Sequence, residues 1–352
     1  MWFSNQIIPW YQKNLRKLPW RETKDPYKIW ISEVILQQTR VDQGLPYYHN
    51  FLKAFPTIQK LAIAEENQVL KLWQGLGYYS RARNLHTTAK QITTKRNGHF
   101  PTDYHDILKL KGVGTYTAAA ISSFCYGKPY PVLDGNVYRV ISRVFGIYDD
   151  IDSPAGKKIF SDKLSILINV KQPGLFNQAM MEFGALQCVP GIPNCNKCIF
   201  KAQCHAYNKN VINQLPKRSK KVSIRIRYFN YMMINDNNSF FLQKRTKKDI
   251  WQNLYEPLLI ESDKVLNRKE IMSTKEWMRL FSKGIVLKNA SKVYCHKLTH
   301  QTIFARFWVI KSKGPVKIKE LRKIKQSEIK NYPMSKLIET YIDNISVNNC
   351  LK

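Results

Sequence analysis

The chain has 352 residues, which is enough for two or three domains that each bury a hydrophobic core. Lys and Arg number 57 against 25 Asp and Glu, and the resulting formal charge of +32 favours a polyphosphate partner such as nucleic acid, although a lysine-rich composition accounts for part of the excess. The N-terminal residues lack the pattern of a signal peptide and no segment has the length and apolarity of a membrane span, so we expect neither secretion nor a transmembrane segment.

Residues 1–207 predict a succession of helices separated by Pro, Gly or capping residues. One helix begins at Asp25–Pro26, because Asp caps a first turn well and Pro suits the first helical position. Further helices follow Thr57, Ser80, Thr102 and Thr115. Runs of alternating β-branched residues are scarce, so the sequence predicts an all-α domain here.

A basic stretch that contains a proline, Leu215–Lys221, predicts a linker over residues 208–223. Beyond it, the chain predicts an α+β domain over residues 224–345. Strand-like runs at Val222–Ile234 and Phe240–Gln243 flank turn residues at Asp236–Ser239, which is the pattern of a hairpin. The remaining predictions are strands at Leu254–Ile260 and Thr302–Ile310, and helices at Thr274–Phe281 and Pro333–Ile342.

Four cysteines, Cys188, Cys195, Cys198 and Cys204, are separated by six, two and five residues. Closely grouped thiolates favour zinc or an iron-sulfur cluster, whereas disulfides are disfavoured in a reducing compartment. The two-residue gap suits either metal, but gaps of six and five are long for a zinc finger. The spacing resembles the loop of the endonuclease III superfamily of DNA glycosylases. That resemblance implies a [4Fe-4S] cluster in a loop over residues 188–204.

Two glycines, Gly112 and Gly114, lie between predicted helices in Leu110–Ala118. They allow a tight turn that points a helix N-terminus at an anion, although a plain helix connection would need the same residues. The segment resembles the helix-hairpin-helix of the same superfamily. The resemblance implies that the backbone binds a DNA phosphate, often together with a monovalent cation.

Two carboxylates have a chemical and a purely structural interpretation. Asp134 stands at the probable start of a helix, where it is a good N-cap and where the helix N-terminus favours an ionised carboxylate able to face positive charge. Glu33 lies among apolar residues on a helix. It is either part of a solvated face or, if enclosed, a proton donor with a raised pKa.

Four runs resemble the adenine DNA glycosylase (MutY) branch of the superfamily, and with the hairpin and the cysteine loop the likeness covers residues 15–204. The runs are residues 18–21, 32–39, 75–85 and 176–185. By resemblance, Glu33 protonates adenine N7 and later serves the incoming water, and Asp134 stabilises or transiently captures the sugar cation. The resemblance also implies that Tyr116 and Asn136 hold Asp134 and the sugar, that Trp20, Arg21 and Glu182 line the adenine pocket, and that Gln38 and Tyr78 enter the duplex.

Tyr116 occupies the position at which the bifunctional branch of the superfamily has a lysine. A phenol cannot form a Schiff base, so hydrolysis without strand cleavage is expected, and a thymine-glycol-type glycosylase/lyase is disfavoured. A DNA-binding iron-sulfur protein without catalysis is a further alternative. It would keep the cysteines and the positive charge, but it would not need Glu33 and Asp134 together.

The runs 241–245 and 250–256 carry a further likeness. Through them, residues 224–345 resemble the Nudix-like domain with which the MutY branch recognises 8-oxoguanine. Glu261, Glu270 and Glu276 do not form a magnesium-binding helix, so pyrophosphate hydrolysis is not expected. The family's Phe-Ser-His loop corresponds to Leu298–His300, which implies recognition through Thr299 and His300. The resemblance thus implies a monomeric, cytoplasmic and nucleoid-associated enzyme of base excision repair. It would hydrolyse adenine from A:8-oxoguanine or A:G mispairs in duplex DNA.

Overall fold

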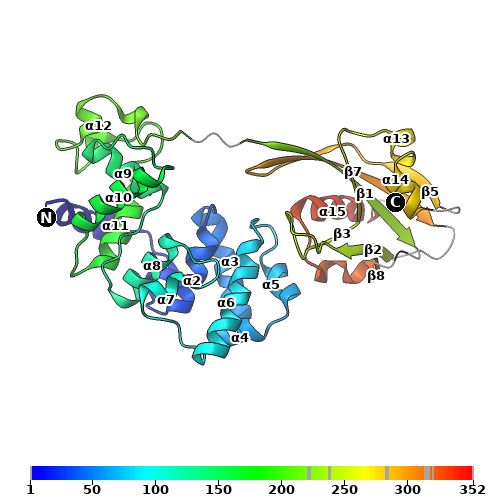
Figure 1. Ribbon diagram of the computed structural model, residues 1–352, viewed down its shortest axis with the longest axis horizontal. Coiled ribbons are helices and arrows are strands. Elements are labelled where there is room, and N and C mark those ends of the chain that lie inside the picture. The colour runs from blue at the N-terminus through cyan, green and yellow to red at the C-terminus, as the bar shows by residue number, and fades with distance from the viewer. Residues whose placement is uncertain are drawn as a thin grey trace. The chain divides into compact units, whose positions relative to one another are not determined.

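The computed structural model describes residues 2–219, 223–236, 239–281, 285–312, 318 and 321–350. Contacts divide the chain into two compact units (Figure 1). The first comprises Met1–Ile63 and Asn84–Lys220, and the second comprises Ala64–Arg83 and Lys221–Lys352. The division after Lys220 falls within the predicted linker, of which residues 220–222 lie outside the described residues. The segment 64–83 precedes the linker by more than a hundred residues, yet it packs with the C-terminal strands.

The described residues of the first unit form helices and loops without a strand, which confirms the prediction of an all-α domain. Helix α2 begins at the predicted residue, and the Asp25 carboxylate accepts a hydrogen bond of 2.9 Å from the Tyr27 amide. Asp103, rather than Thr102, caps α7, and α8 begins at Thr115 itself. The helices are α1 (Trp2–Asn14), α2 (Pro26–Leu36), α3 (Val41–Ala54), α4 (Ile58–Ile63), α6 (Ser80–Arg96), α7 (Tyr104–Leu108), α8 (Thr115–Tyr126), α9 (Gly135–Phe145), α10 (Pro154–Leu167), α11 (Pro173–Leu186) and α12 (His205–Asn208), with short turns η1 (Pro19–Arg21), η2 (Cys195–Lys197) and η3 (Ile212–Gln214).

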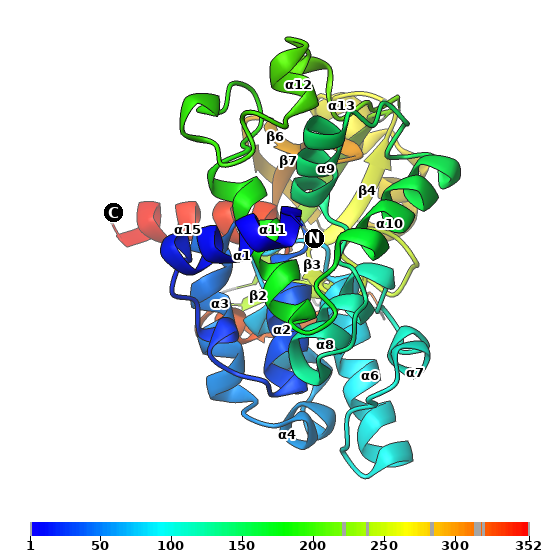
Figure 2. The same cartoon turned by 90° about the vertical axis from the view of Figure 1, so that its left-hand side faces the viewer.

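Helix α11 is central to this unit, because it packs against α1, α8 and α9 (Figure 2). Phe176 and Phe183 on α11 are fully buried, and they join Phe3 and Phe200 in an aromatic core. Helix α2 packs against α3 and α8. This arrangement brings segments from α2, α8, α9 and α11 to one site.

The second unit is a mixed sheet with helices on both faces. Strand β1 runs parallel to β7 from Arg225↔Gln301 to Asn235↔Lys311, and it forms the predicted antiparallel hairpin with β2, whose turn residues 237–238 lie outside the described residues. The strands are β1 (Arg225–Asp236), β2 (Ser239–Lys244), β3 (Tyr255–Glu256), β4 (Leu258–Ser262), β5 (Ile285–Ala290), β6 (Tyr294–Lys297), β7 (Gln301–Ser312) and β8 (Arg322–Lys325), and the helices are α5 (Glu66–Leu72), α13 (Arg268–Met272), α14 (Lys275–Leu280), α15 (Lys336–Cys350) and η4 (Gln326–Asn331).

Two predictions for this unit need correction. The strand expected over Leu254–Ile260 is divided at Pro257, so that β3 pairs with β2 while β4 pairs with β1. Proline cannot donate to a sheet ladder, which explains the break. Helix α15 begins at Lys336, three residues later than predicted, and continues beyond Ile342. The helix at α14 is confirmed.

Alternation along β1 and β7 separates the two faces of the sheet. Met232, Ile234 and Trp308 share a core with Trp277 of α14. On the opposite face, the Phe307 ring stacks on Tyr341 of α15 with 3.7 Å between ring centroids, and Figure 1 shows α15 below β1 and β7. In the described part of the chain, no helix combines the length and apolarity needed to cross a bilayer.

Candidate active site

Glu33 lies on α2 with only 6% of its surface exposed, so it belongs to an enclosed site and not to a solvated face. Burial raises the pKa of its carboxyl to about 7. A hydrogen bond from the Tyr116 hydroxyl and the charge of Arg21 lower this pKa, and the neighbouring Asp134 raises it. Glu33 therefore exchanges its proton near neutral pH, as a general acid must.

Asp134 caps α9, and both of its oxygens are engaged. Oδ1 accepts a hydrogen bond of 2.7 Å from the Val137 amide, and Oδ2 accepts one of 2.8 Å from Asn136 Nδ2. Burial raises the pKa of Asp134 above its ordinary value, while these hydrogen bonds lower it. The helix N-terminus was expected to favour the ionised carboxylate and so to lower its pKa. Burial, which the sequence did not indicate, has the larger effect on the pKa of Asp134.

Tyr116 is the second residue of α8, and its hydroxyl donates to the Glu33 carboxylate and lies 3.4 Å from Met181 Sδ. Burial raises the pKa of this phenol well above its usual value, so the hydroxyl stays protonated. These residues line a cavity of about 190 Å³, smaller than the roughly 300–1,000 Å³ of typical small-molecule sites. The predicted residues that share the cavity are Trp20, Arg21, Glu33, Tyr116, Asp134, Asn136 and Glu182.

Glu182 of α11 is 1% exposed and binds two guanidinium groups at the wall of this cavity. Arg16 donates to it at 2.9 and 2.6 Å, and Arg21 donates at 3.0 and 2.7 Å. Burial alone would raise the pKa of Glu182, but these hydrogen bonds hold it at about 2. The carboxylate therefore orients Arg21 toward the cavity. Arg16 was missed, because no local pattern marks a residue whose partner is 166 positions away.

We expect Glu182→Gln to lower the free energy of unfolding by about 3 kcal/mol, because it leaves two half-buried guanidinium groups without their shared anion. Urea denaturation at pH 7 would measure the loss. Asp162→Asn is a suitable control, since Asp162 is an exposed partner of Lys158 and should change stability by less than about 0.5 kcal/mol. Equal effects of the two substitutions would contradict a buried ion pair of this strength.

A continuous set of hydrogen bonds joins Asp134 to the cysteine loop. Asn136 Nδ2 donates to Asp134, Arg139 Nη2 donates to Asn136 Oδ1 at 2.8 Å, and Arg139 Nε donates to the Cys188 carbonyl at 2.7 Å. Gly184 permits this packing, since a Cβ at that position would lie 2.5 Å from Asn136 Cβ. The sequence drew attention to Asn136, but it gave no signal for Arg139.

The four clustered cysteines lie in the segment between the end of α11 and the start of α12. No disulfide joins the six cysteines whose side chains are described. Burial, and to a smaller extent the nearby thiols of Cys188, Cys204 and Cys195, raise the pKa of Cys198 to about 11, so the four side chains lie within electrostatic range of one another. No three His, Cys, Asp or Glu side chains in the described ranges are placed to hold a single ion. An iron-sulfur cluster has a different requirement, because each cysteine binds a separate iron.

The predicted hairpin lies between α7 and α8. Gly112 has a φ of +80°, and a Cβ there would lie 2.6 Å from Asn84 Cβ, so glycine is required. Gly114 caps α8 in an extended conformation and faces open space, which leaves room for a ligand at the helix N-terminus.

Comparisons with known proteins agree with this geometry. Residues 31–164 match the model of the HhH-GPD superfamily base excision DNA repair proteins, and residues 230–344 match that of the NUDIX domain. The adenine DNA glycosylase of Buchnera aphidicola subsp. Baizongia pistaciae is 37% identical over 315 residues, which span 88% of this chain and 87% of that protein. The chain belongs to the adenine DNA glycosylase family.

Other relatives support the same assignment. The adenine DNA glycosylase of Buchnera aphidicola subsp. Schizaphis graminum is 39% identical over 86% of this chain and 85% of its own length. The solved structure of a thermostable thymine-DNA glycosylase is 28% identical and superposes with a TM-score of 0.54, covering 59% of this chain and 95% of that one. The chain is thus a base-excision-repair enzyme with a helix-hairpin-helix glycosylase domain and a C-terminal Nudix-like domain.

Two exposed residues of this adenine DNA glycosylase have unusual backbone conformations. Gln38 in the first unit has a φ of 55°, and Tyr78 in the second has a φ of 46°. Such values cost about 1–2 kcal/mol for residues other than glycine and are frequent at functional sites. Tyr79, in contrast, is buried and donates from its hydroxyl to the Met334 carbonyl, so it has a packing role.

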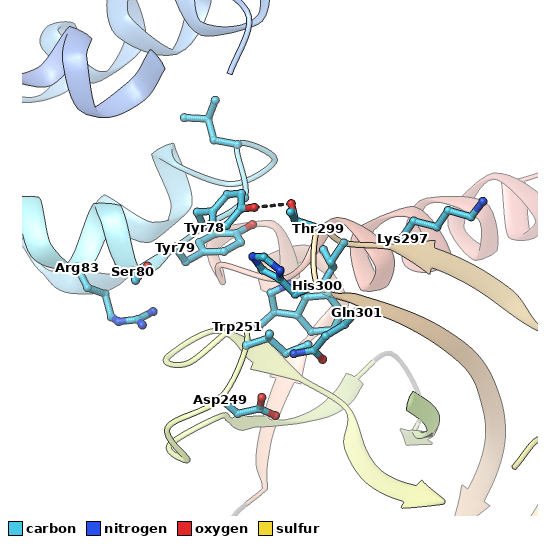
Figure 3. A pocket seen from close by; sticks show the side chains of 14 residues that line it. Tyr78, Tyr79, Ser80, Arg83, Asp249, Trp251, Lys297, Thr299, His300 and Gln301 are labelled. Atoms are coloured by element: carbon cyan, nitrogen blue, oxygen red, sulfur yellow. Dashed lines mark hydrogen bonds between the residues drawn. The ribbon is translucent and has the colours of Figure 1, made fainter. Parts of the chain in front are cut away.

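In the second unit, Tyr78, Thr299 and His300 line one pocket of about 450 Å³. Figure 3 shows the hydroxyls of Tyr78 and Thr299 joined by a hydrogen bond, with His300 and Trp251 below them. Thr299 and His300 are exposed in the turn between β6 and β7. Tyr78 and Thr299 lie about 220 positions apart, and the sequence implied a DNA contact for each of them separately. In the structure they share a pocket.

Proposed function

We propose that this enzyme is a monofunctional adenine DNA glycosylase that acts as a monomer on adenine opposite 8-oxoguanine, or opposite guanine, in duplex DNA. The observation that carries the proposal is a buried glutamic acid, whose pKa burial raises to about 7, in a cavity shared with Asp134 and Tyr116. Two carboxyl groups are what glycosidic hydrolysis requires. Tyr116 stands where a glycosylase/lyase would need an amine.

In the proposed reaction, protonated Glu33 donates its proton to N7 of the flipped adenine, whose bond to C1′ then breaks. The electron pair of that bond leaves with the base, and the sugar becomes an oxocarbenium-like cation. Asp134 faces this cation and stabilises it, held in place by Asn136 and the α9 amides. A water molecule attacks C1′ and gives its proton to the Glu33 carboxylate, which restores the acid.

Trp20 and the Arg21–Glu182 pair would contact the flipped base, with Arg21 as the donor. The 2.7 Å ion pair fixes the direction in which the guanidinium presents its remaining edge. Gln38 and Tyr78 would enter the duplex beside the lesion, where a phenol ring can stack on either neighbouring base. At Gly112 and Gly114, the hairpin would bind a phosphate, with a monovalent cation in the same turn.

Cys188, Cys195, Cys198 and Cys204 would hold a [4Fe-4S] cluster, which when bound supplies a covalent cross-link of the loop. Arg143 supports the loop directly: it donates to the Val189 carbonyl at 2.9 Å, and its Nη1 lies 3.6 Å from Cys188 Sγ. Iron and sulfide analysis of the purified protein tests this assignment. About four of each per chain is expected, and one zinc per chain would refute it.

The proposed substrate is tested with duplexes that carry A opposite 8-oxoguanine, A opposite G, and A opposite T. Strand breaks that appear only after alkali, on the first two duplexes, are expected. Breaks without alkali, or a covalent adduct trapped by borohydride, would identify a lyase. Binding without any product would instead favour a DNA-binding protein that lacks catalysis.

The pH dependence of excision gives an independent test of Glu33. Its pKa is raised to about 7, so the acid form is present below pH 7 and is lost above it. We expect the single-turnover rate to fall roughly tenfold per pH unit above about pH 7.5. It should also fall at low pH, where Asp134 takes up a proton. A rate that is flat or rising between about pH 7 and 9 would contradict the role of Glu33 as acid.

A further inference from the structure

The walls of the pocket that contains Thr299 and His300 consist mainly of turns and loops, together with the first residues of α6 and the strand ends at Lys297 and Gln301. The walls are residues 76–80, residues 249–251 and residues 297–301. Loops move more readily than strands, so a pocket of this kind keeps its shape only if other contacts hold the walls together. The sequence gave no indication of what those contacts are.

Arg227 of β1 joins two of these walls. Its side chain is 6% exposed, and its guanidinium donates to Asp249 at 3.0 and 2.9 Å and to Gln301 Oε1 at 3.2 Å. Asp249 lies in one wall and Gln301 in another. Two further hydrogen bonds of 2.6 and 2.7 Å go to Glu261. All five N–H donors of the guanidinium are therefore used, and the planar group permits only one arrangement of its partners.

A second arginine fixes the loop that carries Asp249. Arg245 donates to Asp249 Oδ2 at 2.8 Å and to the Ile250 carbonyl at 3.1 Å. The Phe229 ring packs against both guanidinium groups, at 4.7 Å from Arg227 and 5.9 Å from Arg245. Next in the loop, Trp251 has a φ of 58°, a strained value that needs such restraint.

Rigid walls matter because the proposed function requires the enzyme to distinguish 8-oxoguanine from guanine. Guanine and 8-oxoguanine differ only at C8, which gains an oxygen, and at N7, which gains a hydrogen. Hydrogen-bonding groups distinguish such ligands strongly only when they are held to within about 0.5 Å. Arg227 itself does not line the pocket, so it would act through Asp249 and Gln301.

We propose that Arg227 is a positioning residue that fixes the spacing of the 249–251 and 297–301 walls, and thereby sets the preference for 8-oxoguanine over guanine opposite adenine. The inference rests on the proposed action on adenine opposite 8-oxoguanine and on recognition of that base through Thr299 and His300, which the sequence implies. It adds a residue on β1 whose own contacts are all with protein. A purely structural role for the ion pairs would lower stability without changing the ratio of rates on the two mispairs.

The test is the ratio of single-turnover excision rates on A:8-oxoguanine and A:G at subsaturating enzyme. Arg227→Lys keeps the charge but cannot make five planar hydrogen bonds, and it should lower the ratio roughly tenfold. The rate on A:G itself should change less than about twofold. Arg306→Lys is the matched control, because Arg306 is on the adjacent β7 and donates to the Leu266 carbonyl away from the pocket.

Each outcome decides the inference. A lower ratio in Arg227→Lys alone supports it, whereas an unchanged ratio, or an equal loss in Arg306→Lys, overturns it. If Arg227→Lys does not fold, Asp249→Asn replaces it, and there too a lower ratio supports the inference and an unchanged ratio overturns it. A wild-type enzyme without preference for 8-oxoguanine would overturn the proposed lesion recognition and the inference with it. If the wild-type enzyme prefers 8-oxoguanine and the variant keeps the same ratio of rates, only the inference about Arg227 is overturned.

Discussion

Replacing Glu33 with Gln is expected to lower the single-turnover excision of adenine by about 10³-fold, while binding to A:8-oxoguanine DNA stays within about threefold of wild type. The amide has nearly the shape of the carboxyl group, but it cannot transfer a proton to the base. A gel-based excision assay with excess enzyme and a titration on the same duplex would measure both quantities. Excision within tenfold of wild type would show that another group protonates adenine.

The same substitution should make the protein more stable at alkaline pH. Folding raises the pKa of Glu33 from 4.5 to about 7, so the native state holds this proton more tightly than the unfolded state does. The stabilisation from the protonated form is complete below about pH 4.5 and is lost as pH rises through 7. Glu33→Gln should therefore gain up to about 3 kcal/mol at pH 8 and nothing at pH 4. A loss of stability at pH 8 would contradict the burial of an ionised carboxylate.

Asp134→Asn is expected to lower the excision rate by about 10²- to 10³-fold and to lower stability by only about 1 kcal/mol, for the lost hydrogen bond from Asn136 Nδ2. Asn is as good an N-cap as Asp, so the hydrogen bond from the Val137 amide and the start of α9 are retained. The amide carries no charge, however, and it cannot stabilise a cationic sugar. Single-turnover rates and thermal unfolding on the same preparation separate the two effects.

The control for Asp134 is Asp103→Asn, because Asp103 also caps a helix but lies outside the catalytic cavity. It accepts hydrogen bonds from the amides of His105 and Asp106 at the start of α7. This variant should excise adenine within about twofold of wild type. A comparable loss of rate in both variants would mean that capping, and not the charge of Asp134, explains the effect.

Most residues of the candidate cavity were predicted from the resemblance to the MutY branch, because local patterns alone left Glu33 and Asp134 with both a structural and a chemical interpretation. Local signals did predict the helix start and the hairpin near it. Asp134 is followed by Gly and Asn at a helix start, and Gly112 occupies a turn that needs a positive φ. These signals depend on neighbours within a few positions, and a single sequence contains them. The all-α character of the N-terminal domain and the α+β character of the C-terminal domain could also be predicted, from capping residues, strand-like runs and turn residues that are close together in the sequence.

The arginines that support the cavity, the cysteine loop and the second pocket could not be predicted, because their partners are far away in the sequence. Arg16 and Glu182, Arg139 and Cys188, and Arg227 and Gln301 meet only after the fold has formed. An arginine on a helix or strand looks the same in sequence whether it is solvated or buried against an anion. The grouping of residues 64–83 with the second unit depends on the same kind of contact, as when Gln74 donates to Glu339.

The double duty of Asp134 has a genetic consequence. Because the same side chain caps α9 and, in the proposed reaction, faces the sugar cation, exchange for another good capping residue would leave a folded protein that still binds DNA. Such a protein would occupy mispairs without releasing the base, and it would shield them from any functional copy in the same cell. Loss of this carboxylate would therefore behave as a dominant allele, whereas loss of a core residue such as Phe183 would simply remove the protein.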